Sequence, residues 1–255
     1  MSKPPVSADY VSLQLALVDR FVELGIGSYA SGVDQLTNLR RRLGLGAPSD
    51  PSWVRLLEQL DAYDDHASCV NAVMEVAVTT PSVEPEHIAR GWPTSGAFSL
   101  DVRGAAAQTH FFSMDTDTTS PLARPKLPQR RRELASVIAH ARREHPDLRL
   151  ITRGSWLYST TSYASLFPPE HLRTATVRRG RNTFQGMSHW GQFLDHRGAL
   201  RTDLANDFRS RVATWSGDDP CLLFPIATLE VSSPIETFDP CADRGAEVGS
   251  DIFRP

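Results

Sequence analysis

The spacing of apolar residues changes near residue 95, and this change constrains the fold more than any other feature of the chain. Before it, apolar residues recur at helical spacing, as in Leu13, Leu17, Phe21 and Leu24. After it, residues 97–102 alternate apolar and polar side chains, which is the pattern of a strand with one buried face. Helices followed by strands mixed with helices favour an α+β fold over a regular β-α-β winding.

The first third of the chain is predicted to be mostly helical. Apolar spacing predicts helices over residues 11–24, 33–43, 51–60 and 66–77. Asp50 before Pro51 is a helix cap followed by proline at the first helical position. Gly25 and Gly44 are placed to end two of the other helices.

The remainder is predicted to form a mixed sheet with packed helices. Two strands, 97–102 and 109–114, flank a hairpin turn, and Leu134, Val137, Ile138 and Ala141 make one face of a helix over 128–145. Further elements are expected at 148–151 (strand), 163–167 (short helix stopped by Pro168), 202–215 (helix) and 222–231 (strand, at an edge or bulge because of Pro225). This gives a helical section over 1–95, a core with the site over 96–240 and a tail over 241–255.

Composition excludes several classes of protein. The chain has 255 residues, of which 40% are apolar, and no run reaches the ~18 to 20 apolar residues of a membrane-spanning helix. The first ten residues lack the pattern of a signal peptide, so we expect a cytoplasmic protein without a membrane partner. A net charge of −3 and a pI of about 6.2 argue against a dedicated nucleic-acid binder.

The cysteines predict neither a disulfide framework nor a zinc site. Cys69, Cys221 and Cys241 are odd in number and lack C-x-x-C pairing, so we expect reduced thiols and no bound metal. No glycine-rich phosphate loop or Rossmann fingerprint is present, and no cofactor is expected.

The first candidate site is the loop that follows His110. Asp115 and Asp117 stand two residues apart just after a predicted strand, where two carboxylates can hold a cation or accept a proton. A turn with side-chain-to-backbone hydrogen bonds explains the same Asp- and Thr-rich loop without chemistry.

The second candidate site follows the strand at 148–151. Arg153 can clamp an anion, Ser155 offers a hydroxyl, and Trp156 and Tyr158 can supply apolar walls with polar tips. Core packing is the competing interpretation of Trp156. Ser155 lacks the G-x-S-x-G setting of a hydrolase nucleophile.

The third candidate site lies between Gly186 and His196. Met187, Trp190 and Gln192 surround His189, which can act as an acid, a base or an anion donor. A histidine packed in the core is the alternative. We expect all three segments to converge on one pocket, with Asp115, Asp117 and His189 as catalytic groups and the others, including His110, binding substrate.

Several motifs carry a resemblance to a known group of proteins. The runs Arg153–Tyr158 (R-G-S-W-L-Y) and Met187–Asp195 (M-S-H-W-G-Q-F-L-D) resemble a family of uncharacterised bacterial proteins, and the similarity spans about residues 120–240. That family is associated with actinobacterial natural-product gene clusters, including those that build aziridine-containing amino acids. The resemblance implies natural-product biosynthesis but assigns no catalytic residue.

These observations favour a cofactor-independent enzyme that acts on a small, polar, anionic metabolite by acid–base and electrostatic catalysis. The resemblance extends this to ring closure, in which an amine displaces a neighbouring sulfate or phosphate. Two alternatives remain. One is a metal-dependent group transferase that uses the Asp115-x-Asp117 loop, and the other is a non-catalytic small-molecule-binding protein, with or without a pathway partner protein.

Overall fold

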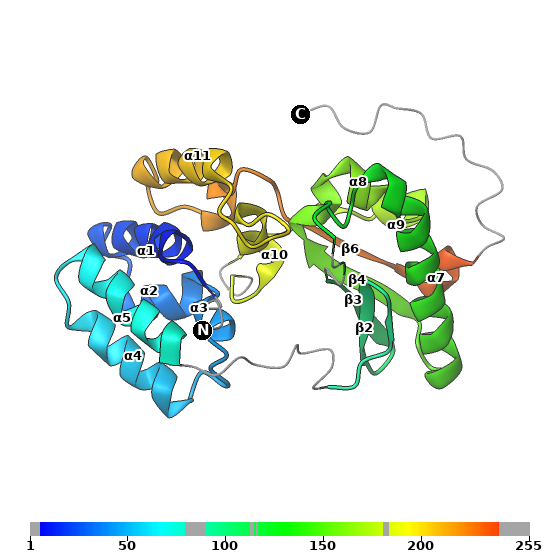
Figure 1. Ribbon diagram of the computed structural model, residues 1–255, viewed down its shortest axis with the longest axis horizontal. Coiled ribbons are helices and arrows are strands. Elements are labelled where there is room, and N and C mark those ends of the chain that lie inside the picture. The colour runs from blue at the N-terminus through cyan, green and yellow to red at the C-terminus, as the bar shows by residue number, and fades with distance from the viewer. Residues whose placement is uncertain (1–5, 80–89, 113–114, 116, 181–183, 240–255) are drawn as a thin grey trace. The chain divides into compact units, whose positions relative to one another are not determined.

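The computed structural model describes residues 6–79, 90–112, 115, 117–180 and 184–239 of an α+β protein (Figure 1). Contacts within the chain divide it into two compact units. Unit 1 consists of Met1–Glu84 and Arg178–Thr228, and unit 2 consists of Pro85–Val177 and Leu229–Pro255. This division differs from the predicted boundaries, because residues 178–228 join the N-terminal helices instead of the sheet. The predicted tail, 241–255, lies outside the described residues.

Unit 1 is helical. Its N-terminal segment forms α1 (Ala8–Glu23), α2 (Tyr29–Leu36), α3 (Leu39–Arg42), α4 (Pro51–Asp61) and α5 (His66–Thr79). Its second segment adds α10 (Met187–Trp190), α11 (Thr202–Ala213) and the 3-10 helices η4 (Gly191–Phe193) and η5 (Pro220–Leu223). Trp190, Phe193, Phe208 and Phe224 from this second segment are buried in the same apolar core as α1, which explains why residues so distant in sequence share a unit.

Local signals in the helical unit work as predicted, except in one helix. Asp50 caps α4 by accepting a hydrogen bond from the Ser52 N–H at 2.8 Å, with Pro51 at the first helical position. The predicted helix over 33–43 is instead divided between α2 and α3. Thr37 is extended, and the N–H of the buried Asn38 donates to Gln14 Oε1 at 2.9 Å, so a partner on α1 replaces a helical hydrogen bond.

Unit 2 contains a mixed sheet. In the part of the chain that the structure describes, its strands are β1 (Thr94–Ser95), β2 (Phe98–Arg103), β3 (Ala106–Phe111), β4 (Leu150–Ser155), β5 (Thr176–Val177) and β6 (Leu229–Pro234), in the order β1-β2-β3-β4-β6-β5. The predicted hairpin is confirmed: β2 and β3 pair antiparallel, and Gly104 has a φ of +58° in the turn. β3 and β4 are parallel, whereas β6 runs antiparallel to both of its neighbours.

One long helix covers the sheet as its apolar pattern predicts. α7 (Leu127–Glu144) packs against β2, and Leu134, Val137, Ile138 and Ala141 are all buried in the unit 2 core (Figure 1). Short helices η1 (Arg124–Lys126), η2 (Trp156–Ser159), α8 (Thr161–Ala164), α9 (Pro169–Leu172) and η6 (Ile235–Phe238) complete the unit.

Several boundaries in unit 2 differ from the prediction. The second hairpin strand, expected over 109–114, is Ala106–Phe111, and the short helix expected over 163–167 is Thr161–Ala164. The strand expected over 222–231 begins only at Leu229, and Pro225 lies outside it because residues 220–223 form η5 in the other unit. Pro169 begins α9 instead of only ending the preceding helix, as proline does at a first helical position. β4 extends to Ser155, beyond the predicted end at residue 151.

The described helices include none that is both long and apolar enough to cross a membrane.

Candidate functional site

The predicted site residues are divided between the two units. His110, Asp115, Asp117 and the Arg153–Tyr158 segment belong to unit 2, whereas the Met187–Gln192 segment belongs to unit 1.

Asp115 and Asp117 form ion pairs with basic side chains. Lys126 Nζ lies 2.8 Å from a carboxylate oxygen of each, and Arg130 Nη2 lies 2.5 Å from Asp115. Arg130 is itself buried, and it also pairs with Glu133 at 2.8 Å. Both aspartates are thus already paired with basic side chains, which compete with a metal ion for their oxygens.

These ion pairs also weaken both carboxylates as bases. Hydrogen bonds from Arg130 and then Lys126 lower the pKa of Asp115 below its usual range. Hydrogen bonds from Lys126 and Thr119 lower the pKa of Asp117 to about 2. Thr119 donates both its N–H and its hydroxyl to Asp117, which is the side-chain-to-backbone turn that the sequence left open as an alternative.

Arg153 and His110 do meet within unit 2. Arg153 Nη1 lies 3.4 Å from His110 Nε2, and the His110 ring lies 4.5 Å from the Trp92 ring, centroid to centroid. Both residues follow Gln108 and Thr152, the last described pair between the parallel strands β3 and β4.

The other residues of the Arg153–Tyr158 segment have structural contacts. Ser155 Oγ accepts a hydrogen bond from the Leu157 N–H at 3.2 Å and caps η2. Tyr158 is buried among aromatic rings with its hydroxyl 3.5 Å from Thr109 Oγ1, and burial raises its pKa above the usual range. Trp156 is half-buried.

Residues 187–192 are mostly part of the unit 1 core. His189 is 1% exposed and its ring lies 4.8 Å from Phe184 and 5.0 Å from Phe224, centroid to centroid. The Trp190 indole donates to Leu36 O at 3.1 Å. Such packing matches the core alternative for His189.

Two further side chains in this segment also serve the fold. Gln192 Nε2 donates to His189 O and Ile226 O, and its Oε1 accepts from the Ile226 N–H at 2.8 Å. Met187 is 39% exposed, with its Sδ 3.2 Å from Asn38 Nδ2.

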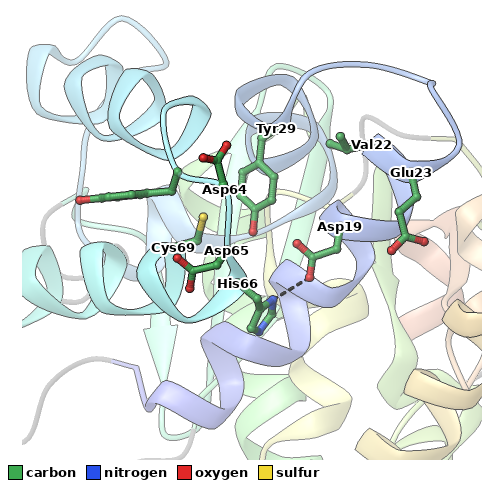
Figure 2. Close-up of a pocket in the computed structure, with 9 residues that line it drawn as sticks. Asp19, Val22, Glu23, Tyr29, Asp64, Asp65, His66 and Cys69 are labelled. Atoms are coloured by element: carbon green, nitrogen blue, oxygen red, sulfur yellow. Dashed lines mark hydrogen bonds and ion pairs between the residues drawn. The ribbon is translucent and has the colours of Figure 1, made fainter.

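A cavity that sequence reasoning missed lies in unit 1, between α1, α2 and the beginning of α5. Its volume is about 430 Å³, within the range of small-molecule sites. The lining residues are Asp19, Val22, Glu23, Tyr29, Tyr63, Asp64, Asp65, His66 and Cys69 (Figure 2).

Two of the lining side chains, Asp19 and His66, belong to a hydrogen-bonded chain that continues to Ser12. His66 Nδ1 lies 2.6 Å from Asp19 Oδ2, and His66 Nε2 lies 2.8 Å from Ser12 Oγ (Figure 2 shows the first bond). The carboxylate beside Nδ1 favours the tautomer with its proton there, so that Nε2 accepts from the Ser12 hydroxyl. The side chains of His66 and Asp19 are 36% and 32% exposed, which leaves both within reach of a ligand.

Tyr29 and Cys69 also line the cavity, and both have raised pKa values. The Tyr29 hydroxyl is buried beside the Asp19 carboxylate and the Cys69 thiol. Burial, with the nearby Asp19 carboxylate and Cys69 thiol, raises the pKa of Tyr29 far above its usual range. Burial also raises the pKa of Cys69, which like Cys221 is a buried free thiol; Cys241 lies outside the described residues.

The Ser12–His66–Asp19 chain resembles the arrangement of a hydrolase triad, but its setting favours another role. Ser12 lies within α1 and is not among the lining residues. Asp65 accepts hydrogen bonds from the N–H and hydroxyl of Ser68 at the beginning of α5, so a carboxylate occupies the helix end where an oxyanion would need donors. We therefore assign Ser12 and Asp19 as groups that position His66.

Part of this site left a signal in the sequence. Ser12 and Asp19 are seven residues apart, which places them on one face of a helix. Nothing local links them to His66, which comes 47 residues after Asp19 and meets it only because α1 packs against α5.

Comparison with known proteins gives no assignment. No protein-family model matches the chain, and neither a curated protein nor a solved structure shows a significant match to it.

Proposed function

We propose that this protein is a cofactor-independent enzyme that acts on a small polar metabolite by acid–base catalysis in the unit 1 cavity. The observation that carries the proposal is His66, a partly exposed imidazole held on one side by Asp19 and on the other by Ser12 beside a cavity of about 430 Å³. A general base needs a fixed ring orientation and a lone pair that the substrate can reach. The two hydrogen bonds supply the orientation, and the Nε2 lone pair becomes available when a substrate hydroxyl takes the place of Ser12.

The chemistry follows from the two hydrogen bonds of the ring. A substrate hydroxyl that replaces the Ser12 hydroxyl at His66 Nε2 can give its proton to that nitrogen: the substrate O–H bond breaks, an N–H bond forms, and the electron pair stays on the substrate oxygen. The Asp19 carboxylate at Nδ1 stabilises the imidazolium that results. The base is thus His66, because Asp115 and Asp117 are already paired with cations.

Ring closure is not part of this proposal. Displacement of a sulfate or phosphate calls for a cation to receive the leaving anion, and none of the described lining residues is Lys or Arg. The natural-product role implied by the resemblance stays a prediction.

The test is a substrate screen with a matched variant. Pools of small polar metabolites, including amino alcohols, are incubated with the purified protein, and loss of each compound is followed by mass spectrometry. We expect at least one compound to be consumed by the wild-type protein and by a His140→Gln control, which changes an exposed histidine on α7. His66→Gln should consume it more slowly by a factor of roughly 10² to 10⁴.

Three outcomes separate the competing functions. Equal turnover by His66→Gln contradicts the assignment of the base. Loss of turnover on addition of EDTA supports the metal-dependent transferase. Binding without turnover by any form supports the non-catalytic binding protein.

A further inference from the structure

The cavity in unit 1 carries a strongly one-sided charge. Four of its lining side chains are carboxylates, from Asp19, Glu23, Asp64 and Asp65, and its one basic group is His66. In the view of Figure 2, Asp64 and Asp65 lie on one side of the Tyr29 ring and Asp19 and Glu23 on the other. A charged group of a ligand in this cavity therefore lies close to several carboxylates.

The four carboxylates differ in whether a basic side chain or a hydrogen-bond donor of the protein already binds them. Glu23 pairs with Arg20 at 3.1 Å and is 62% exposed. Asp65 caps α5, and hydrogen bonds from Ser68 lower its pKa, which keeps it ionised. Asp19 faces an imidazole, and Asp64 has no hydrogen bond or ion pair among the described residues.

The aromatic lining favours a cation as well. Tyr29 and Tyr63 both line the cavity, and the face of a phenol ring attracts an organic cation. The Tyr29 hydroxyl is buried beside Asp19 and Cys69, so the part of this side chain that a ligand can meet is its ring.

A metal ion fits this cavity less well than an organic cation. Among the described residues no three His, Cys, Asp or Glu side chains come together as metal ligands do. The carboxylates are instead spread around a space of about 430 Å³, large enough for an organic molecule.

We infer that the ligand of this cavity is a small organic cation, a metabolite with an ammonium group, and not the anionic metabolite expected from the sequence. The inference rests on the proposed function only for the role of His66. Carboxylates that hold an ammonium group also raise its pKa, so the proton that His66 accepts comes from another group of the same molecule, such as a hydroxyl.

Three probes of similar size and different charge test the charge preference. 2-Phenylethylammonium, 2-phenylethanol and phenylacetate are titrated separately into the protein at low salt, with the NMR signals of the His66 and Tyr29 rings as the readout. We expect a saturable response to the ammonium, with a Kd at least about tenfold lower than that of the alcohol, and no response to phenylacetate. Added salt should weaken the ammonium complex.

A charge variant localises the effect. Asp64→Asn removes one charge at an exposed side chain with no described hydrogen bond to lose, and it should raise the Kd of the ammonium about fivefold. Asp207→Asn makes the same change on α11, where Asp207 pairs with Arg211, and should leave the Kd unchanged.

Each alternative result is decisive. Equal or tighter binding of phenylacetate overturns the inference, as does an absence of response to the ammonium up to about 20 mM, well above a millimolar Kd. Equal weakening by both variants shows a general charge effect and overturns it too. If the ammonium binds as expected but His66→Gln keeps full turnover in the metabolite screen, the proposed function fails while the ligand class stands.

Discussion

Single polar side chains in this protein are fixed by partners that lie far away in the sequence. Asp115 is held by Arg130, Asp19 by His66, and His171 by Ser233, whose Oγ lies 2.7 Å from His171 Nδ1. The first pair leaves a carboxylate that is a poor base. The hydrogen bond to Asp19 orients the His66 imidazole beside a cavity. His66, and not Asp115, is therefore the proposed base.

The stability of the protein should depend on pH through His171. This side chain is fully buried among aromatic rings, and burial lowers its pKa to about 4, from 6.5 when unfolded. Between these values the unfolded chain binds more protons than the folded one. Stability from this residue is therefore complete above pH 6.5 and is lost as the pH falls towards 4, by about 3 kcal/mol in all.

Urea unfolding of the wild-type protein and of His171→Gln at several pH values between 7 and 4 measures this contribution. The free energy of unfolding should fall more steeply in the wild-type protein, whatever the stability of the variant at pH 7. Parallel curves for the two proteins would show that His171 does not titrate in this range.

Elements that carry a continuous apolar face bear the main packing of their unit. α7 is the clearest case, since Val137 and Ile138 lie in the unit 2 core while Ala139 beside them is exposed. Ile138→Ala should lower the free energy of unfolding by about 2 to 5 kcal/mol, because it leaves a cavity under the helix.

Ala139→Ser is the matched control on the same helix. It replaces an exposed residue and should change the free energy by no more than about 0.5 kcal/mol, the difference in helix propensity. Chemical denaturation measures both variants. Similar losses in the two would mean that burial of Ile138 is not what stabilises α7.

At the scale of the whole molecule, the chain builds two separate apolar cores. One contains buried residues only from unit 1 and the other only from unit 2. Each unit is made of two chain segments, so neither can be isolated by cutting the chain once. Each core is nevertheless complete within its own unit, as in an independent domain.

We expect two transitions in calorimetric unfolding. Ile138→Ala should lower the midpoint of one of them by at least about 5 °C, and Leu13→Ala, in the core of unit 1, should lower only the other. A single transition shifted by both variants would show that the units unfold as one.

The sequence by itself determined the elements whose signals are local. Helical spacing located α1 and α7, the Asp50–Pro51 pair located the beginning of α4, and alternation with a glycine turn located the β2–β3 hairpin, since each signal acts within one element. The α+β class follows from their order.

Tertiary structure alone decided which elements share a core and which polar groups meet. Nothing local shows that residues 178–228 pack with the first helices, that β3 pairs in parallel with β4, or that His66 lies between Ser12 and Asp19. Each of these contacts forms because apolar faces become buried. The sequence pattern of a face shows that it will be buried but not which other face will cover it. The choice among partners depends on complementary shape across the whole core, which no short stretch of residues contains.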